Sequence, residues 1–222
     1  MKLRKVMAIV LAFAVLVSLS VPALAGIGGY VAPPRLPCAP APVTQDQVNQ
    51  ATTAAVAGGQ VVFVNISTIA SSALQGVLAQ APENAFVFVD NRVDNAILSR
   101  IFINAEMAAL LPETINLAVH VCGCCQQAPQ VAALFERFFT NNVVAVSFEH
   151  QGAFGTYIRV AVRVDLTNLN TESLIFYAYD RASNRYTLLE APNYRIDALG
   201  FLHFSTPVGG DIIITDRPLA LR

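Results

Sequence analysis

Lysine is absent from the chain after residue 5, and charged residues of either sign are scarce. Lys2, Arg4 and Lys5 account for three of the 14 basic residues, which leaves 11 arginines against 15 acidic residues in the rest of the sequence. Nucleic acids and anionic lipid surfaces are recognised by clustered basic residues, and the sequence contains no run of them. We therefore expect neither nucleic acid nor an anionic membrane surface as a partner.

The basic N-terminus precedes an uncharged run, residues 6–21, which Pro22 and the small residues Ala23 and Ala25 follow. This order is typical of a secretory signal peptide, residues 1–25, with cleavage before Gly26. The alternative is an uncleaved anchor, for which about 18 apolar residues are needed. Because the run is slightly shorter and ends in a small-residue site, we expect a protein that is secreted or displayed at the cell surface, with no transmembrane anchor after cleavage.

The remaining chain has the size of one domain, and the apolar content of the full sequence, 55%, allows a large core. Residues 26–59 are rich in Pro, Gly and Ala and predict a linker, with a candidate short helix after Thr44. We expect the folded domain to span residues 60–217 and residues 218–222 to form a tail. No cofactor is predicted.

Short β-branched and aromatic runs recur from residue 61 onward and predict strands at 61–64, 116–121 and 157–166. Helical spacing predicts a helix over 71–81, capped by Ser71 or Ser72, and another over 129–139. Turn residues predict three hairpins, which join 85–89 to 96–103, 174–179 to 186–190, and 201–205 to 211–215. The fold class expected is mainly β, an antiparallel β-sandwich with two short helices.

Alternation is clearest in residues 157–166, where every second side chain is aliphatic. This spacing predicts one buried and one solvent-exposed sheet face. Aromatic rings stack on sugars, and Arg and Asp supply directional hydrogen bonds, so the exposed face is a candidate ligand-binding surface. The alternative is an ordinary solvated face with cross-strand charge pairs. The candidate ligand face consists of Tyr157, Arg159, Arg163 and Asp165, extended by Tyr177 and Tyr179.

Four cysteines, Cys38, Cys122, Cys124 and Cys125, form an even set, which in an exported protein favours disulfides. Three pairings are consistent with the sequence. The alternative is a zinc or Cu(I) site in which His120 joins the three clustered thiolates. The ligands do not divide into two separate pairs as in most structural zinc sites, so we favour disulfides or free thiols over a metal.

Catalytic patterns are sparse. No G-x-S-x-G sequence is present, and the histidines are only three in number, His120, His150 and His203. Ser147 and Glu149 lie close to His150, and a hydrolase that used Glu149 and His150 would need both side chains in one cleft. Alternation along a strand would instead direct them to opposite faces.

The second half of the sequence contains a series of short strand and turn motifs, at residues 147–152, 174–180, 186–189, 197–204 and 209–215. Together they resemble a family of poorly characterised extracellular β-sandwich domains in secreted and surface proteins of Firmicutes. In that family a Tyr-rich strand and turn precede an aliphatic hairpin, a D-x-x-G-aromatic-x-x-F segment and a closing strand. The resemblance implies a bacterial, non-catalytic accessory domain of the cell exterior.

We therefore expect an exported, non-enzymatic domain that acts in adhesion, in cell-envelope architecture or in binding of a cell-wall or glycan ligand. Two alternatives belong to other classes of function. One is an extracellular hydrolase, and the other is a metal-binding or redox role for the cysteine cluster, residues 122–125.

Overall fold

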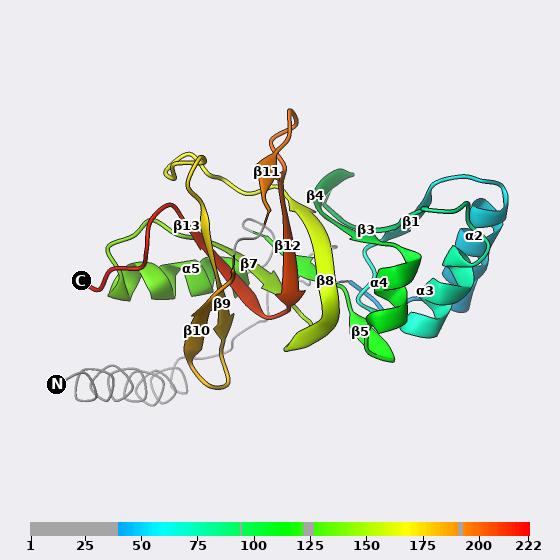
Figure 1. Ribbon diagram of the computed structural model, residues 1–222, viewed down its shortest axis with the longest axis horizontal. Helices are drawn as coiled ribbons and strands as arrows, with labels where there is room; N and C mark the ends of the chain where they lie inside the picture. Colours follow the sequence, from blue (N-terminus) through cyan, green and yellow to red (C-terminus); the bar gives the residue numbers. More distant parts are fainter. Residues whose placement is uncertain (1–39, 94, 122–126, 191–192) are drawn as a thin grey trace, which may run out of the picture. The chain divides into compact units, whose positions relative to one another are not determined.

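The computed structural model describes residues 40–222, except residues 94, 122–126 and 191–192 (Figure 1). Over the described residues the chain forms thirteen strands and four helices, so the predicted class, mainly β, is confirmed. Two of these helices were predicted for the domain, a third was the candidate in the linker, and one was not predicted. The strands form a six-stranded, a five-stranded and a two-stranded sheet.

The six-stranded sheet is mixed. Strand β1 runs parallel to β3, with Val61 beside Val87, whereas the other neighbours are antiparallel. The prediction of a purely antiparallel fold is therefore wrong at this edge, because the chain returns from β1 to β3 through a crossover that contains a helix. In spatial order the strands are β1 (Val61–Val64), β3 (Val87–Val93), β4 (Ala96–Ile103), β8 (Ala153–Val162), β12 (Leu202–Val208) and β11 (Arg195–Ile196).

The five-stranded sheet is antiparallel throughout, and it contains the predicted hairpin between residues 174 and 190. Its strands are, in spatial order, β10 (Arg185–Leu188), β9 (Ile175–Asp180), β13 (Asp211–Thr215), β7 (Val144–Phe148) and β6 (Val119–His120). The two-stranded sheet pairs β2 (Thr68–Ala70) with β5 (Thr114–Asn116).

Strands β12 and β13 follow one another in the chain but belong to different sheets. The predicted hairpin between them is therefore wrong. The chain does bend at Gly209 and Gly210, and Gly210 has a φ of 85°, which favours glycine. Gly209 lies so close to His150 that a Cβ would overlap the His150 carbonyl oxygen. This turn directs the chain from one sheet to the other.

The predicted hairpin between residues 85–89 and 96–103 forms as β3 and β4, but its turn is shorter than expected, because β3 continues through the polar residues to Val93. Asp90 is completely buried within the strand. A bulge at Asn91 and Arg92 shifts the register against β4. A polar run can extend a strand when its neighbours supply partners, as two arginines do for Asp90 below.

The four helices are α2 (Gln45–Val56), α3 (Ser71–Leu78), α4 (Ala105–Leu110) and α5 (Gln127–Phe138). Helix α2 lies in the predicted linker, begins with a capping box between Thr44 and Gln47, and buries Ala51 and Ala55 in the core. Helix α3 has Ala70 at its N-cap instead of a capping serine. Helix α4 was not predicted, and the Asn104 side chain accepts a hydrogen bond at its start.

Helix α5 packs on the five-stranded sheet (Figure 1). Phe135 makes edge contacts with Tyr179 and stacks on Phe139. Residues 218–222, the predicted tail, run beside the end of this helix, where the backbone of Phe139 forms a β-bridge with that of Leu221. This face of the sheet is therefore covered.

One large core joins the two main sheets, and Phe176 of β9 lies against Phe204 of β12 with ring centroids 5.2 Å apart. In β8 and β12 every second side chain enters this core, among them Ile158, Val160 and Phe204. The opposite face of the six-stranded sheet carries polar and aromatic side chains, and the candidate site lies there.

Candidate functional site

A row of residues crosses the outer face of the six-stranded sheet. The backbone pairs Asp90 with Arg100, Arg100 with Ala161, Ala161 with His203, and His203 with Arg195. Directly opposed residues of neighbouring strands point to the same face. Two arginines, one carboxylate and one histidine are thus aligned over five strands, with the small Ala161 between the larger side chains.

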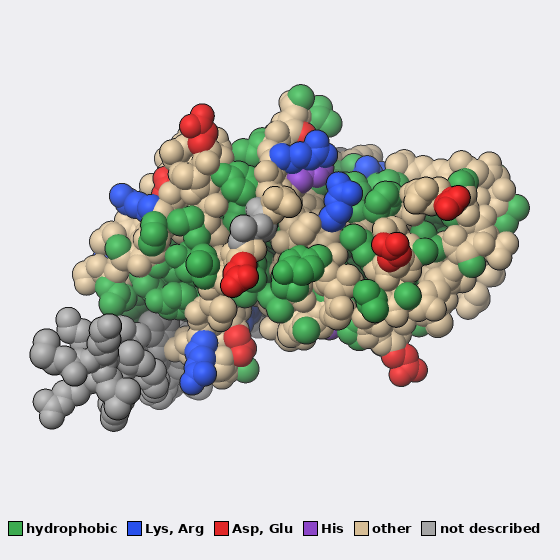
Figure 2. All heavy atoms as spheres, viewed as in Figure 1, with side chains coloured by type: hydrophobic (Ala, Val, Ile, Leu, Met, Phe, Trp, Pro, Cys, Tyr) green, Lys and Arg blue, Asp and Glu red, His purple; other side chains and the backbone are tan. Residues whose placement is uncertain are grey.

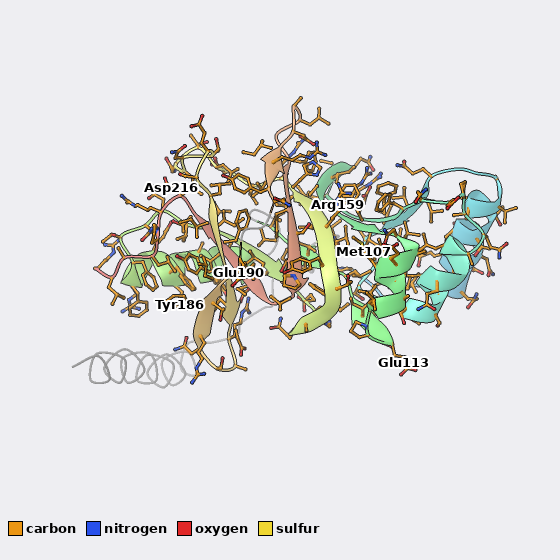
Figure 3. All side chains as sticks on the ribbon, in the orientation of Figure 1. Met107, Glu113, Arg159, Tyr186, Glu190 and Asp216 are labelled. Atoms are coloured by element: carbon orange, nitrogen blue, oxygen red, sulfur yellow. The ribbon has the colours of Figure 1, made fainter. Side chains whose placement is uncertain are left out.

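A second row lies beside the first and is mostly aromatic. It pairs Phe88 with Phe102, Phe102 with Arg159, and Arg159 with Ser205. The Arg159 guanidinium lies over two rings, 5.4 Å from the centroid of Phe102 and 5.8 Å from that of Phe86. We call the surface formed by the two rows the Arg–Phe face. Figure 3 labels Arg159, which extends from β8.

Asp90 holds two arginines at one end of the Arg–Phe face. Arg100 donates from Nε and Nη2 to its two carboxylate oxygens, and Arg92 donates to Oδ2 at 2.6 Å. Burial acts to raise the pKa of Asp90, but the hydrogen bonds from Arg100 and Arg92 hold the pKa below its ordinary value. One carboxylate thus serves two guanidinium groups, and a positive charge remains in excess.

His203 is held from the other side by Asp197, whose Oδ2 lies 2.8 Å from the histidine Nε2. The other carboxylate oxygen of Asp197 accepts from the backbone N–H groups of Leu199 and Phe201. These hydrogen bonds, above all that from His203, lower the pKa of Asp197. The loop between β11 and β12 therefore fixes the orientation of the imidazole.

Two clefts open on the Arg–Phe face, and His203 lines both. The larger has a volume of about 330 Å³, and the smaller has a volume of about 150 Å³. The first, which we call the arginine cleft, is lined by Arg159, Val160, Asn193, Tyr194, Arg195, His203, Phe204 and Ser205. The second, the apolar cleft, is lined by Ile97, Arg100, Phe102, Ala161, Asp197, Leu199, Phe201 and His203.

The face is locally cationic although the chain carries a net negative charge. Half of the ten arginines in the described residues lie on it or at its margin, and Figure 2 shows basic side chains gathered around a histidine there. Arg92 and Arg100 form ion pairs with Asp90. The other three arginines are Arg159, Arg163 and Arg195, and none of them forms an ion pair within the described part of the chain.

The four predicted ligand-face residues lie on or just beyond β8. Tyr157 is 58% exposed, and Arg159 is exposed and lines the arginine cleft. Strand β8 ends at Val162, so Arg163 and Asp165 follow it rather than extend it. Arg163 lies over the ring of Phe201, whereas Asp165 closes a local turn by accepting from the backbone of Thr167.

Other residues of the two clefts were missed. Arg100, Arg195 and His203 come from neighbouring strands of the same sheet, and only strand pairing brings them beside Arg159. The alternation of Leu202 and Phe204 with His203 and Ser205 was the signal that could have placed the histidine on the exposed face.

Tyr177 and Tyr179 do not extend this surface. They belong to β9 of the other sheet and are only 8% and 7% exposed, because α5 and Phe135 cover them. Alternation identifies the two faces of a strand, but it does not show whether a helix covers one of them.

The residues considered for hydrolysis make other contacts. Glu149 Oε1 lies 2.6 Å from His120 Nε2, whereas His150 stacks on Phe154 and its Nε2 lies 3.1 Å from the Ala153 carbonyl oxygen. The structure therefore pairs Glu149 with His120 instead of His150.

Ser147 is buried in β7, where its hydroxyl donates to Asp211 at 2.6 Å. Arg181 also donates to Asp211, from Nε and Nη2. The serine hydroxyl therefore lies inside the sheet, bonded to a carboxylate that is already paired with a guanidinium.

All four cysteines, Cys38, Cys122, Cys124 and Cys125, lie outside the described residues, as does the predicted signal peptide. Within residues 40–222, the described part contains no group of three or more side chains arranged to hold a metal ion. The helices there are also too short or too polar to cross a membrane.

Comparison with known proteins gives no relative from which a role could be inferred. No protein-family model matches the chain, and no curated protein matches it.

Proposed function

We propose that this chain is an exported, non-enzymatic accessory domain of the cell envelope that binds a glycan on the Arg–Phe face. Its export rests on the signal peptide predicted from residues 1–25. Its ligand-binding role rests on the outer face of the six-stranded sheet.

We further propose that the domain is built as a β-sandwich with an added helical layer. The shared core and the contact between Phe176 and Phe204 support face-to-face packing of the two main sheets. Helix α5 covers the far side of one sheet. The far side of the other is left to the solvent and to a ligand.

The observation that carries the proposal is the position of Arg159. Its guanidinium lies on two phenylalanine rings at the rim of the arginine cleft, and it makes no ion pair with the described residues. Stacking on rings restricts an arginine side chain and leaves its N–H edge available for hydrogen bonds. A cleft of this size with few, well-placed polar groups is typical of small-ligand sites.

The test is binding of residues 26–222 to purified cell-wall polysaccharide and to an array of immobilised glycans. We expect retention on at least one glycan, and we expect Arg159→Ala to weaken it about tenfold or more. Arg137→Ala is the matched control, because Arg137 also lies over a ring, that of Phe138, but on α5. Retention on no glycan or wall fraction, or equal losses in both variants, would contradict the proposal.

A further inference from the structure

We infer that the ligand is an acidic oligosaccharide that occupies both clefts, with its carboxylate or phosphate in the arginine cleft and a sugar ring in the apolar cleft. This inference rests on the proposed function and specifies its ligand class.

The arginine cleft is suited to an anion. Arg159 and Arg195 contribute guanidinium groups to its lining, and Asn193 and Ser205 add neutral hydrogen-bonding groups. Its lining contains no acidic side chain. Arginine forms paired hydrogen bonds with carboxylate and phosphate oxygens, so two uncompensated guanidiniums at one cleft favour such a group over a neutral hydroxyl.

Charge elsewhere on the face reinforces this preference. Arg92 and Arg100 share the single carboxylate of Asp90, so this buried group does not neutralise them both. Arg100 lies in the row that also contains His203 and Arg195. The arginines of the Arg–Phe face therefore leave it with an excess of positive charge, although Asp197 also lies there beside His203.

The apolar cleft is suited to the C–H face of a sugar ring. Phe102, Phe201 and Ile97 line it together with Leu199, which is 73% exposed. Aromatic and aliphatic surfaces pack well against the C–H face of a pyranose. Asp197 lies at the same cleft and can accept hydrogen bonds from sugar hydroxyls.

His203 lines both clefts, so a ligand that fills the two must pass over the imidazole. A single sugar occupies one cleft only. The ligand therefore has at least two units, one charged and one without charge at the position that meets Asp197.

The same geometry disfavours a nucleic acid. A nucleic acid backbone carries a phosphate at every unit. The unit beyond the arginine cleft would then bring a second phosphate toward the carboxylate of Asp197, and like charges repel. A glycan with spaced charges avoids this contact.

The test measures the affinity of residues 26–222 by calorimetry for four probes. These are an oligosaccharide in which uronic acids alternate with neutral sugars together with its single uronic acid, a matching oligosaccharide with a phosphate on every second sugar, a neutral glucan oligosaccharide and single-stranded DNA. We expect the affinity to rise at least about tenfold from the single uronic acid to the alternating oligosaccharide, and to fall with added salt. Binding of the phosphate-bearing oligosaccharide in place of the uronic one would assign the charge to phosphate and would also support the inference.

Three variants separate the two clefts. Arg195→Gln should weaken acidic oligosaccharides about tenfold or more and leave neutral ones unchanged. Leu199→Ser should weaken binding of oligomers while the affinity for the single acidic sugar stays the same. Arg137→Gln is the control. Leu199 and Arg195 are exposed, so both variants should fold.

Two outcomes would overturn the inference. One is neutral glucan bound as tightly as the alternating acidic oligosaccharide and unaffected by Arg195→Gln, in which case glycan binding itself would stand. The other is DNA bound more tightly than every glycan. Binding of no glycan would count against the proposed function as well.

Discussion

The Arg100 guanidinium donates to both carboxylate oxygens of Asp90, with Nε 2.6 Å from Oδ1 and Nη2 2.9 Å from Oδ2. Asp90 is completely buried in β3, and Arg92 completes its hydrogen bonds. This cluster fixes one end of the Arg–Phe face. It also provides the most direct test of what holds that face together.

Asp90→Asn should lower the free energy of unfolding by about 2 kcal/mol, because it leaves two guanidiniums without a carboxylate. We expect no larger loss, because the two arginine side chains are partly exposed and the solvent can screen their charges once the carboxylate is gone. The measurement is the urea midpoint. Asp165→Asn is the control, since Asp165 is exposed and caps only a local turn, and it should change stability by less than about 0.5 kcal/mol.

The same carboxylate predicts a pH dependence. The pKa of Asp90 is lower in the folded protein than in the unfolded chain, so its contribution to stability is complete above the unfolded value of about 3.9. This contribution to stability is lost as the pH falls below the unfolded pKa and then through the lower pKa of Asp90 in the folded protein. Urea midpoints between pH 7 and pH 2 should therefore fall less steeply for Asp90→Asn than for the native chain, and parallel profiles would refute this assignment.

Gly209→Ala should destabilise the protein by about 3 kcal/mol or more, or prevent folding, because the new methyl group would overlap the backbone carbonyl of His150. Gly76→Ala is a contrasting change. Gly76 lies in α3 with open space around its Cα, so alanine there should stabilise the protein by up to about 1 kcal/mol. Thermal unfolding of both variants measures the difference, and similar effects would show that the turn tolerates a side chain.

Thr44→Ala should cost about 1 kcal/mol if α2 unfolds together with the sheets, because it removes the N-cap of that helix. Thr53→Ala in the same helix removes only an exposed hydroxyl that donates to the carbonyl of Asn49, and it should be neutral or slightly stabilising. If α2 instead unfolds separately from the sheets, neither variant should change the urea midpoint of the β domain.

Local patterns in the sequence were enough to place several elements. The strand at Val61–Val64 has the predicted bounds, and the hairpin of β9 and β10 forms around the predicted turn. The helices near residues 71 and 129 also form. Each of these depends on turn residues and spacing within one segment.

The errors arose where distant segments decide the outcome. Asp90 belongs to a strand because Arg100 lies opposite it, and no local signal reveals that neighbour. The glycines at 209 and 210 do mark a bend in the chain, but the hairpin predicted there does not form, since β13 pairs with β7 and β9. The same reason explains the candidate site, where Arg159 was predicted but its neighbours Arg195 and His203 were not.

The passage of the chain between sheets at Gly209 also bears on how the protein folds. Asp211, just after this turn, pairs with Ser147, which lies 64 residues earlier in the chain. Closing so long a loop precedes any gain from pairing, and proteins dominated by such pairings fold in about milliseconds to seconds. Until that loop closes, the apolar strand β13 stays unpaired and exposed, so the yield of refolding should fall as the protein concentration rises.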